Sequence, residues 1–134
     1  MKITEITRRS ILDYIILNNV NWSGRLEETD FVSRLYDTKN MQSFDNRYPN
    51  FAGDIRQHRI NNYDWDDYWI FTDERINLNR CPDEEYLRFL CEMLHPVVRP
   101  DSEEQDKLLG FLNLELRNDG FELYPNELVS GRSV

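Results

Sequence analysis

The sequence predicts a mainly α-helical protein: a compact bundle of about five helices with a small C-terminal β-hairpin. Apolar residues recur at helical spacing in several separate segments. Proline and acidic residues mark helix starts, and a glycine followed by a short alternating segment closes the chain. With 134 residues, the chain is long enough for one domain with its own apolar core.

The first helix is expected over residues 3–18 and the second over residues 29–37. Apolar side chains of the first follow i, i+1, i+4 and i+5 spacing (Ile11, Leu12, Ile15 and Ile16). The second also carries apolar residues at helical spacing (Phe31, Val32, Leu35 and Tyr36). Each stripe is expected to face the common core.

A loop over residues 38–49, rich in Asn, Ser and Asp, separates these helices from a third helix over residues 50–61. In the third helix Phe51 and Ile55 are expected to face inward, with His58 close to the same stripe.

The aromatic segment at residues 68–72 is predicted to be either a buried strand or a short irregular part of the core. Five residues do not decide between the two. Aspartates on both sides of it favour turns.

The fourth helix begins near Pro82 and ends before Pro96. Proline suits a first helical turn, and the acidic residues that follow it favour the positive end of the helix dipole. The fifth helix is capped by Asp101 or Ser102, and Gly120 is expected as the residue that ends it. Four leucines supply its core face (Leu108, Leu109, Leu112 and Leu116).

The C-terminal hairpin is expected to pair residues 121–124 with residues 128–129 across a Pro-Asn turn. The chain stops soon afterwards, without another helix or a charged tail. We therefore expect residues 1–134 to be a single domain from the N-terminal part of a longer multidomain protein.

The net charge of −9 is unevenly distributed along the chain. Residues 1–60 carry 9 Lys/Arg against 8 Asp/Glu, whereas residues 61–134 carry 7 against 17. An acidic surface repels the phosphate backbone. We therefore expect no tight nucleic-acid binding.

The expected compartment depends on hydrophobic segments and cysteines. Without an apolar run of 18 residues, no membrane-spanning helix is expected, and the N-terminus lacks the apolar region of a signal peptide. These features predict a cytoplasmic protein, in which Cys81 and Cys91 would stay reduced.

The most unusual stretch is residues 54–75, which we call the hub. Its 22 residues contain one His, three Arg, five Asp and five aromatic side chains. Buried charges are tolerated only when they are paired and hydrogen-bonded. We therefore expect the polar groups of the hub to hold one another in fixed geometry.

The hub is the predicted structural or interaction site. We expect four of its side chains to be largely buried (His58, Tyr63, Trp65 and Trp69). Arg56, Arg59 or Arg75 should pair with an aspartate of the hub (Asp64, Asp66, Asp67 or Asp73). Asn61 belongs to the same predicted site, and so does Arg99, which lies outside the hub. Prolines on both sides of residues 97–99 predict an extended connection from which Arg99 folds back onto an acidic hub residue.

A metal site or cofactor is not expected. The soft ligands His58, Cys81, Cys91 and His95 do not show the paired spacing of a zinc site. The aspartates at positions 64, 66 and 67 lack the glycine and terminal glutamate of an EF-hand loop. Capping and ion pairing with arginine explain them more simply.

Arg88 and His95 form the one candidate catalytic pair. They are seven residues apart on the fourth helix, and therefore on one face of it. This spacing resembles the R-x₄₋₆-H motif of HEPN ribonucleases, in which the His would act on the 2′-hydroxyl proton and the Arg would hold the phosphate. The structural alternative is a histidine favoured at a helix C-terminus by the dipole.

Two blocks carry a family resemblance: Asp54-Ile-Arg-Gln-His-Arg-Ile-Asn-Asn-Tyr-Asp-Trp-Asp-Asp-Tyr-Trp-Ile-Phe and Leu87-Arg-Phe-Leu-Cys-Glu-Met-Leu-His-Pro-Val-Val-Arg-Pro-Asp. Together with the ending Gly120-Phe-Glu-Leu-Tyr-Pro-Asn-Glu-Leu-Val-Ser-Gly-Arg, they resemble the third class of AbiJ N-terminal domains. Such domains stand at the front of bacterial antiphage, abortive-infection proteins. The resemblance covers residues 5–132.

The resemblance implies a division of labour. A toxic effector, often a HEPN ribonuclease, would lie C-terminal to this domain, which would act as a non-catalytic sensor, adaptor or regulator. Its partners would be that effector domain and a phage or host protein that serves as trigger, and an oligomer is compatible with this. The resemblance supplies no active-site residues. A small HEPN-like ribonuclease that uses Arg88 and His95 remains the alternative.

Overall fold

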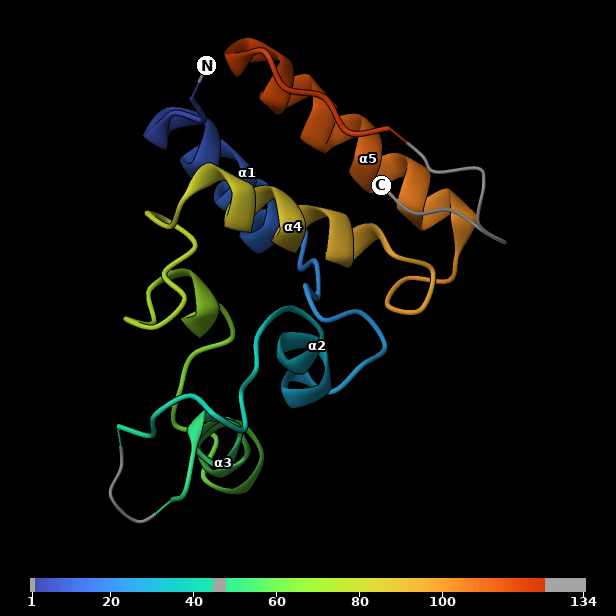
Figure 1. Ribbon diagram of the computed structural model, residues 1–134. Helices are drawn as coiled ribbons and strands as arrows, with labels where there is room; N and C mark the ends of the chain where they lie inside the picture. Colours follow the sequence, from blue (N-terminus) through green and yellow to red (C-terminus); the bar gives the residue numbers. More distant parts are fainter. Residues whose placement is uncertain (1, 45–47, 125–134) are drawn as a thin grey trace.

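The computed structural model describes residues 2–44 and 48–124, and its elements are helical (Figure 1). The longest helices, α1 (Glu5–Leu17), α4 (Asp83–Leu94) and α5 (Ser102–Leu116), gather in one half, where α5 contacts both others. The short helices α2 (Glu28–Leu35) and α3 (Phe51–Arg56) contact each other in the second half. Within the described ranges, none of these helices combines the length and apolar character needed to cross a membrane.

Side-chain caps explain where the helices start. The hydroxyl of Thr4 accepts the amide of Thr7 at 3.2 Å, and Asp101 accepts the amide of Glu103 at 2.9 Å. Asn50 caps α3 in the same way. The observed bounds of α1, α2, α4 and α5 lie close to the predicted ones, although α2 and α4 begin without a side-chain cap and their bounds follow from their apolar stripes.

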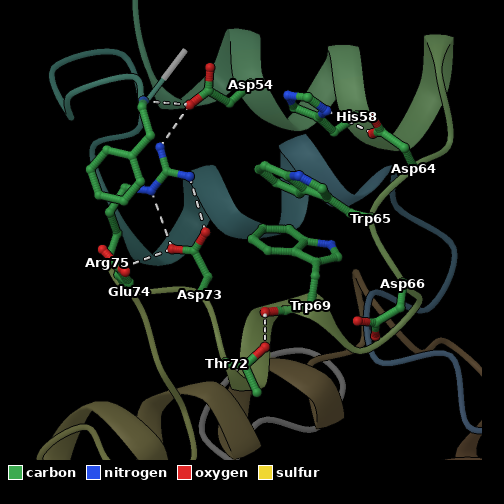
Figure 2. A pocket seen from close by; sticks show the side chains of 11 residues that line it. Asp54, His58, Asp64, Trp65, Asp66, Trp69, Thr72, Asp73, Glu74 and Arg75 are labelled. Atoms are coloured by element: carbon green, nitrogen blue, oxygen red, sulfur yellow. Dashed lines mark hydrogen bonds and ion pairs between the residues drawn. The ribbon is translucent and has the colours of Figure 1, made fainter.

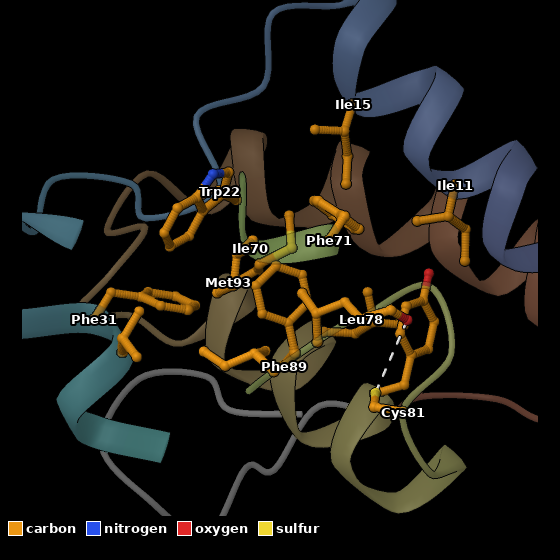
Figure 3. Close-up of a cluster of buried hydrophobic side chains, with 14 of the residues drawn as sticks. Ile11, Ile15, Trp22, Phe31, Ile70, Phe71, Leu78, Cys81, Phe89 and Met93 are labelled. Carbon is orange, nitrogen blue, oxygen red and sulfur yellow. Dashed lines mark hydrogen bonds between the residues drawn. The ribbon is translucent and has the colours of Figure 1, made fainter. Parts of the chain in front are cut away.

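A cluster of aromatic rings joins the two halves (Figure 3). Phe89 of α4 packs edge-on against Phe31 of α2 and Phe71, with ring centroids 5.7 Å apart in both pairs. Trp22 contacts Phe31 at 5.3 Å, and Ile11 of α1 is fully buried in the same core. Each buried aromatic removes a large apolar area from water, so these rings dominate the stability of the core.

The connection between α1 and α2 is attached to the segment that follows α4. The amide of Arg25 donates to the Val98 carbonyl at 3.0 Å. Gly24 has φ of +58°, and a Cβ at this position would lie 2.1 Å from the same carbonyl oxygen. Glycine is therefore required here both by conformation and by the close approach of the two chain segments.

The segment after α4 differs from the prediction. The amides of Val98 and Arg99 both donate to the His95 carbonyl, at 2.9 and 2.8 Å, so the chain turns tightly instead of extending. Arg99, 2% exposed, donates to the carbonyls of Met93 (3.3 Å) and Asn21. The prediction that Arg99 reaches an acidic side chain of the hub was therefore wrong, because this turn directs it to the ends of α1 and α4.

The C-terminal part of the described chain also differs from the prediction. The 3₁₀ turn η3 (Arg117–Asp119) follows α5, and Gly120 then reverses the chain with φ of +85°, as expected. The segment then runs back beside α5 (Figure 1). The Asn113 side chain of α5 binds the Leu123 backbone twice, through its amide (2.9 Å) and its oxygen (2.7 Å).

The predicted hairpin is not confirmed. No β-strand occurs in residues 2–44 or 48–124, and the backbone of 121–124 pairs with a helix side chain instead of a second strand. The second half of the predicted hairpin, residues 128–129, lies outside the described residues. The mainly α-helical class is correct.

The aromatic segment at 68–72 is neither a strand nor irregular. It forms the 3₁₀ turn η2 (Trp69–Phe71), whose three side chains are buried. Its backbone accepts hydrogen bonds from Leu78 (3.3 Å to Ile70) and Asn79 (3.1 Å to Phe71). The turn therefore carries three consecutive side chains into the core, which an alternating strand could not do.

Candidate functional site

The hub begins within α3, which continues into a π-helical turn, η1 (Gln57–Asn61). The amide of Asn62 donates to the Gln57 carbonyl at 2.8 Å, a wider ring than an α-helix forms. The extra residue in the turn leaves His58 half-buried and buries Arg59, which is 9% exposed. Single π turns of this kind are frequent at functional sites.

Arg59 lies at the centre of the hub. Its Nε and Nη2 atoms donate to the two carboxylate oxygens of Glu28 on α2, at 2.7 and 3.0 Å. Nη1 donates to the Trp65 carbonyl at 2.6 Å, and Nη2 also donates to Asp67 at 3.0 Å. Hydrogen bonding to Glu28, followed by that to Asp67, holds the pKa of Arg59 well above its ordinary value. One buried cation thus joins α2, the π turn and residues 65–67.

Two aromatic side chains complete this network. The Trp69 indole N–H donates to Glu28 at 2.9 Å, and the Tyr63 hydroxyl donates to Asp67 at 2.9 Å. The Tyr63 ring centroid lies 4.7 Å from the Arg59 guanidinium carbon. The hydrogen bond from Arg59, followed by that from Tyr63, lowers the pKa of the Asp67 carboxyl.

Tyr63 was predicted to be buried, but it is 64% exposed. Its backbone φ is +54°, a conformation uncommon for a residue with a side chain. The residue stands at the break after the π turn, and its ring covers the Arg59 guanidinium from the solvent side instead of entering the core.

Three rings form an aromatic ladder from the surface into the core: His58, Trp65 and Trp69. His58 stacks on Trp65 with centroids 4.8 Å apart and an interplanar angle of 9°, and Trp65 contacts Trp69 at 4.9 Å. Trp69 is 4% exposed and reaches Trp22 of the core at 6.0 Å. His58 is additionally fixed by Asp64, with 2.7 Å between Nδ1 and Oδ1. Burial was therefore predicted correctly for Trp69, whereas Trp65 and His58 are half-buried.

A second cation, Arg75, lies to one side of the ladder (Figure 2). Its guanidinium donates to Asp54 at 2.8 Å and to both oxygens of Asp73 at 3.2 and 3.0 Å. The ring centroids of Phe44 and Phe51 lie 4.2 and 3.9 Å from its central carbon. Burial opposes its charge, but hydrogen bonds to Asp73 and Asp54 raise the pKa of Arg75 overall.

The ladder and Arg75 border an open pocket of about 870 Å³, which we call the hub pocket (Figure 2). Aromatic and acidic side chains dominate its lining (Phe44, Asp54, His58, Asp64, Trp65, Asp66, Trp69, Thr72, Asp73, Glu74 and Arg75). Asp66 lies at one side of it and accepts the amide of Tyr68 at 2.8 Å.

The family comparison agrees with the sequence resemblance. The model of the family described as AbiJ N-terminal domain 3 matches residues 2–134. The chain belongs to this family. It is therefore a domain of the abortive-infection defence type. No curated protein and no solved structure matches the chain.

In this AbiJ N-terminal domain most of the predicted hub residues come together, and the predicted pairing of arginines with aspartates is confirmed. Arg59 binds Asp67, and Arg75 binds Asp73. Asn61 is different, because it is exposed and its amide reaches only the Gln57 side chain, at 3.1 Å.

In the AbiJ domain Arg88 and His95 turn to different partners. Arg88 donates to the Leu35 carbonyl at 3.2 Å and lines a second pocket of about 620 Å³ between α2 and α4. Glu84 and Glu92 line this second pocket too, whereas His95 does not. His95 ends α4, and its Nδ1 accepts the amide of Val97 at 3.0 Å.

The aspartates at positions 64, 66 and 67 turn to separate partners: His58, a backbone amide and Arg59. In residues 2–44 and 48–124, no three His, Cys, Asp or Glu side chains gather closely enough to hold a metal ion. Cys81 is buried and Cys91 half-buried, and burial raises the pKa of Cys91 to about 11. Burial also raises the pKa of Cys81, so neither thiol has the lowered pKa of a reactive cysteine.

Sequence reasoning missed several residues of the site. Glu28, the main partner of Arg59, looks like an ordinary acidic residue in the first turn of a helix. Phe44 stands in a loop and carried no periodic signal. Asp54 did carry a periodic signal, because it follows Phe51 by three residues and therefore lies on the inward face of α3. Its carboxylate is buried there, with the residue 1% exposed.

Proposed function

We propose that this chain is a non-catalytic sensor or adaptor domain of an abortive-infection protein, and that the hub pocket is its recognition surface. The observation that carries this proposal is the preorganisation of the pocket. Arg59 does not line the pocket, but its four hydrogen bonds to three residues include one to the carbonyl of Trp65, which does. Arg75, in the lining itself, is held by two carboxylates and two rings. A surface fixed before binding loses less conformational entropy when a partner docks.

The bonding within the pocket supports recognition more than catalysis. A general acid or base must exchange a proton with the substrate, so it needs a polar atom available to the substrate. Asp54 and Asp73 instead hold Arg75, and Asp64 holds the ring of His58. These three carboxylates shape the pocket, whereas Asp66 and Glu74 of its lining are exposed.

The proposed partners are those that the family context suggests. The first is an effector region C-terminal to this domain in the same polypeptide, which the domain would hold in check or activate. The second is a phage or host protein that acts as trigger. Both would meet the domain in the cytoplasm, and self-association is compatible with either.

A pocket-filling substitution tests the recognition surface. Thr72 is exposed and lines the hub pocket, so Thr72→Trp places a large side chain in it. Asn118→Trp is the matched control, because Asn118 is exposed in η3, outside the lining of the pocket. In cells producing the full-length protein, we expect Thr72→Trp to abolish phage protection and Asn118→Trp to preserve it. Protection that survives Thr72→Trp in a folded protein contradicts the proposal.

The competing ribonuclease hypothesis needs a separate test. We expect the purified chain to leave RNA intact, because Arg88 lies among acidic residues and the second half of the chain is strongly acidic. The assay compares the parent with an Arg88→Ala/His95→Ala double variant. Cleavage by the parent that disappears in the variant would overturn the non-catalytic proposal and favour the HEPN-like alternative.

A further inference from the structure

We infer that the hub pocket binds a cationic side chain, the guanidinium of an arginine in a basic polypeptide segment. This inference rests on the proposed function, because it names the chemistry that the proposed recognition surface would take. Charge, shape and an internal guanidinium in the same wall each support it.

The charges of the lining favour a cation. Five carboxylates line the pocket, and Arg75 is the single arginine or lysine among the lining residues described. Asp54 and Asp73 already bind Arg75, which leaves three other carboxylates at the pocket (Asp64, Asp66 and Glu74). Asp66 and Glu74 are exposed, and the Asp64 side chain keeps 53% exposure beside His58. A lining in which carboxylates outnumber cations attracts positive charge and repels nucleic acid.

The shape favours a long side chain over a simple ion. A volume of about 870 Å³ lies in the range of sites that enclose organic ligands. Apolar wall is available as well, because Phe44 is 57% exposed and Trp65 is half-buried. Arginine and lysine bury their methylene stems against apolar surface while the charged head stays near polar groups. Acidic groups beside aromatic rings fit that construction.

Arg75 shows what this set of residue types can hold. In the same wall its guanidinium is bound by two carboxylates and contacts two aromatic rings. A planar guanidinium fits carboxylates in a bidentate manner and stacks on rings, whereas an ammonium acts as a point charge. Arginine is therefore expected to bind more tightly than lysine.

Calorimetry with the 134-residue chain tests the inference. The probe is a hexapeptide with two arginines, compared with versions in which citrulline or lysine replaces both. Citrulline keeps the shape of arginine without its charge. We expect the arginine peptide to bind, the lysine peptide to bind more weakly, and the citrulline peptide to lose at least tenfold in affinity. Binding should also weaken with added salt. Equal binding of the arginine and citrulline peptides would overturn the inference.

Charge-neutralising variants locate the binding. In Asp66→Asn the remaining side-chain oxygen can still accept the Tyr68 amide, and Glu74→Gln changes an exposed side chain. We expect each to weaken the arginine peptide several-fold and both together at least tenfold, with thermal unfolding unchanged. Glu103→Gln is the control, because Glu103 is an exposed acid on α5 outside the pocket lining. Unchanged affinity in the double variant would overturn the inference.

A titration with spermidine distinguishes an arginine of a polypeptide from a free polyamine as the source of the cation. If spermidine binds more tightly than the arginine peptide, the assignment to a polypeptide segment is wrong. The two proposals also fail separately. If Thr72→Trp abolishes phage protection but the parent chain does not bind the arginine peptide, the recognition surface is supported and the assignment of an arginine ligand is rejected. If protection is unaffected in Thr72→Trp, the proposal that the hub pocket is a recognition surface is itself rejected.

Discussion

The helical half around α1, α4 and α5 and the hub hold their shapes by different means. In the helical half most of the side chains that meet are apolar, and Ile11, Leu90 and Leu112 are fully buried, although Arg8 of α1 also pairs with Asp83 of α4 at 2.8 Å. In the hub the central contacts are hydrogen bonds from Arg59 and Arg75 to carboxylates. Apolar burial has no preferred direction, whereas charge-assisted hydrogen bonds fix both distance and angle.

The difference suggests where geometry matters. A buried ion pair seldom stabilises a fold more than apolar packing would, but it penalises every arrangement that leaves a charge unpaired. The hub therefore specifies one arrangement of its rings and carboxylates, while the helical half mainly supplies stability. Four measurements test this difference between the two regions.

The largest effect is expected from Arg59→Ala. It leaves the Glu28 carboxylate without its buried partner, and removal of one member of a buried pair costs about 3–5 kcal/mol. Urea unfolding measures the loss. A double variant that also carries Glu28→Leu should regain part of the stability, because no buried charge is then left over. A loss below about 1 kcal/mol in the single variant would show that the network is not structural.

Leu112→Ala tests the helical half in the same way. Leu112 is fully buried in α5, and truncating a buried leucine costs about 2–5 kcal/mol through lost contacts and the cavity. The loss should be insensitive to salt, unlike that of Arg59→Ala, because no charge is involved. Equal salt dependence of the two variants would remove the distinction between the regions.

A smaller effect is expected from Trp69→Phe. The ring remains in the core, but the indole N–H that Glu28 accepts is lost, which costs about 1–3 kcal/mol. Trp22→Phe is a matched control, because its indole N–H donates to the backbone carbonyl of Asp67 instead of a carboxylate. If Arg59→Ala and Trp69→Phe act through one network, a double-mutant cycle will show coupling between them.

The smallest effect concerns pH. Because the pKa of Asp67 lies below its ordinary value of 3.8, its contribution to stability is complete above about pH 5 and is lost as pH falls through the lower folded-state pKa. The side chain is 60% exposed, so the contribution is about 0.2–1 kcal/mol. Asp67→Asn should flatten this part of the acid unfolding curve, whereas Asp13→Asn, in the exposed pair with Arg9, should change it little.

The same contrast explains what the sequence could predict. The helices were predictable because periodic stripes and caps such as Asp101 are local signals. Glu28 was not, because it lies 31 residues before Arg59, and no pattern distinguishes it from its neighbour Glu27. Long-range pairing of single polar residues leaves no period in the sequence.

Other errors have equally local causes. The exposure of Tyr63 depends on a positive φ, which the sequence does not predict for a tyrosine. The alternating residues 121–124 resemble a strand, but Asn113 of α5 satisfies the Leu123 backbone. In both positions a single unexpected contact or backbone angle decided the outcome.

The π turn at Gln57–Asn61 makes the length of the hub as important as its composition. A π turn corresponds to one residue inserted into an α-helix. Deletion of Ile60, whose side chain is 55% exposed, would remove this extra residue and shorten the connection between His58 and Trp65 by one residue. Trp65 would then leave its place on His58 although no ladder residue had changed. The stacking of the ladder therefore depends on the number of residues in this segment as well as on their identity.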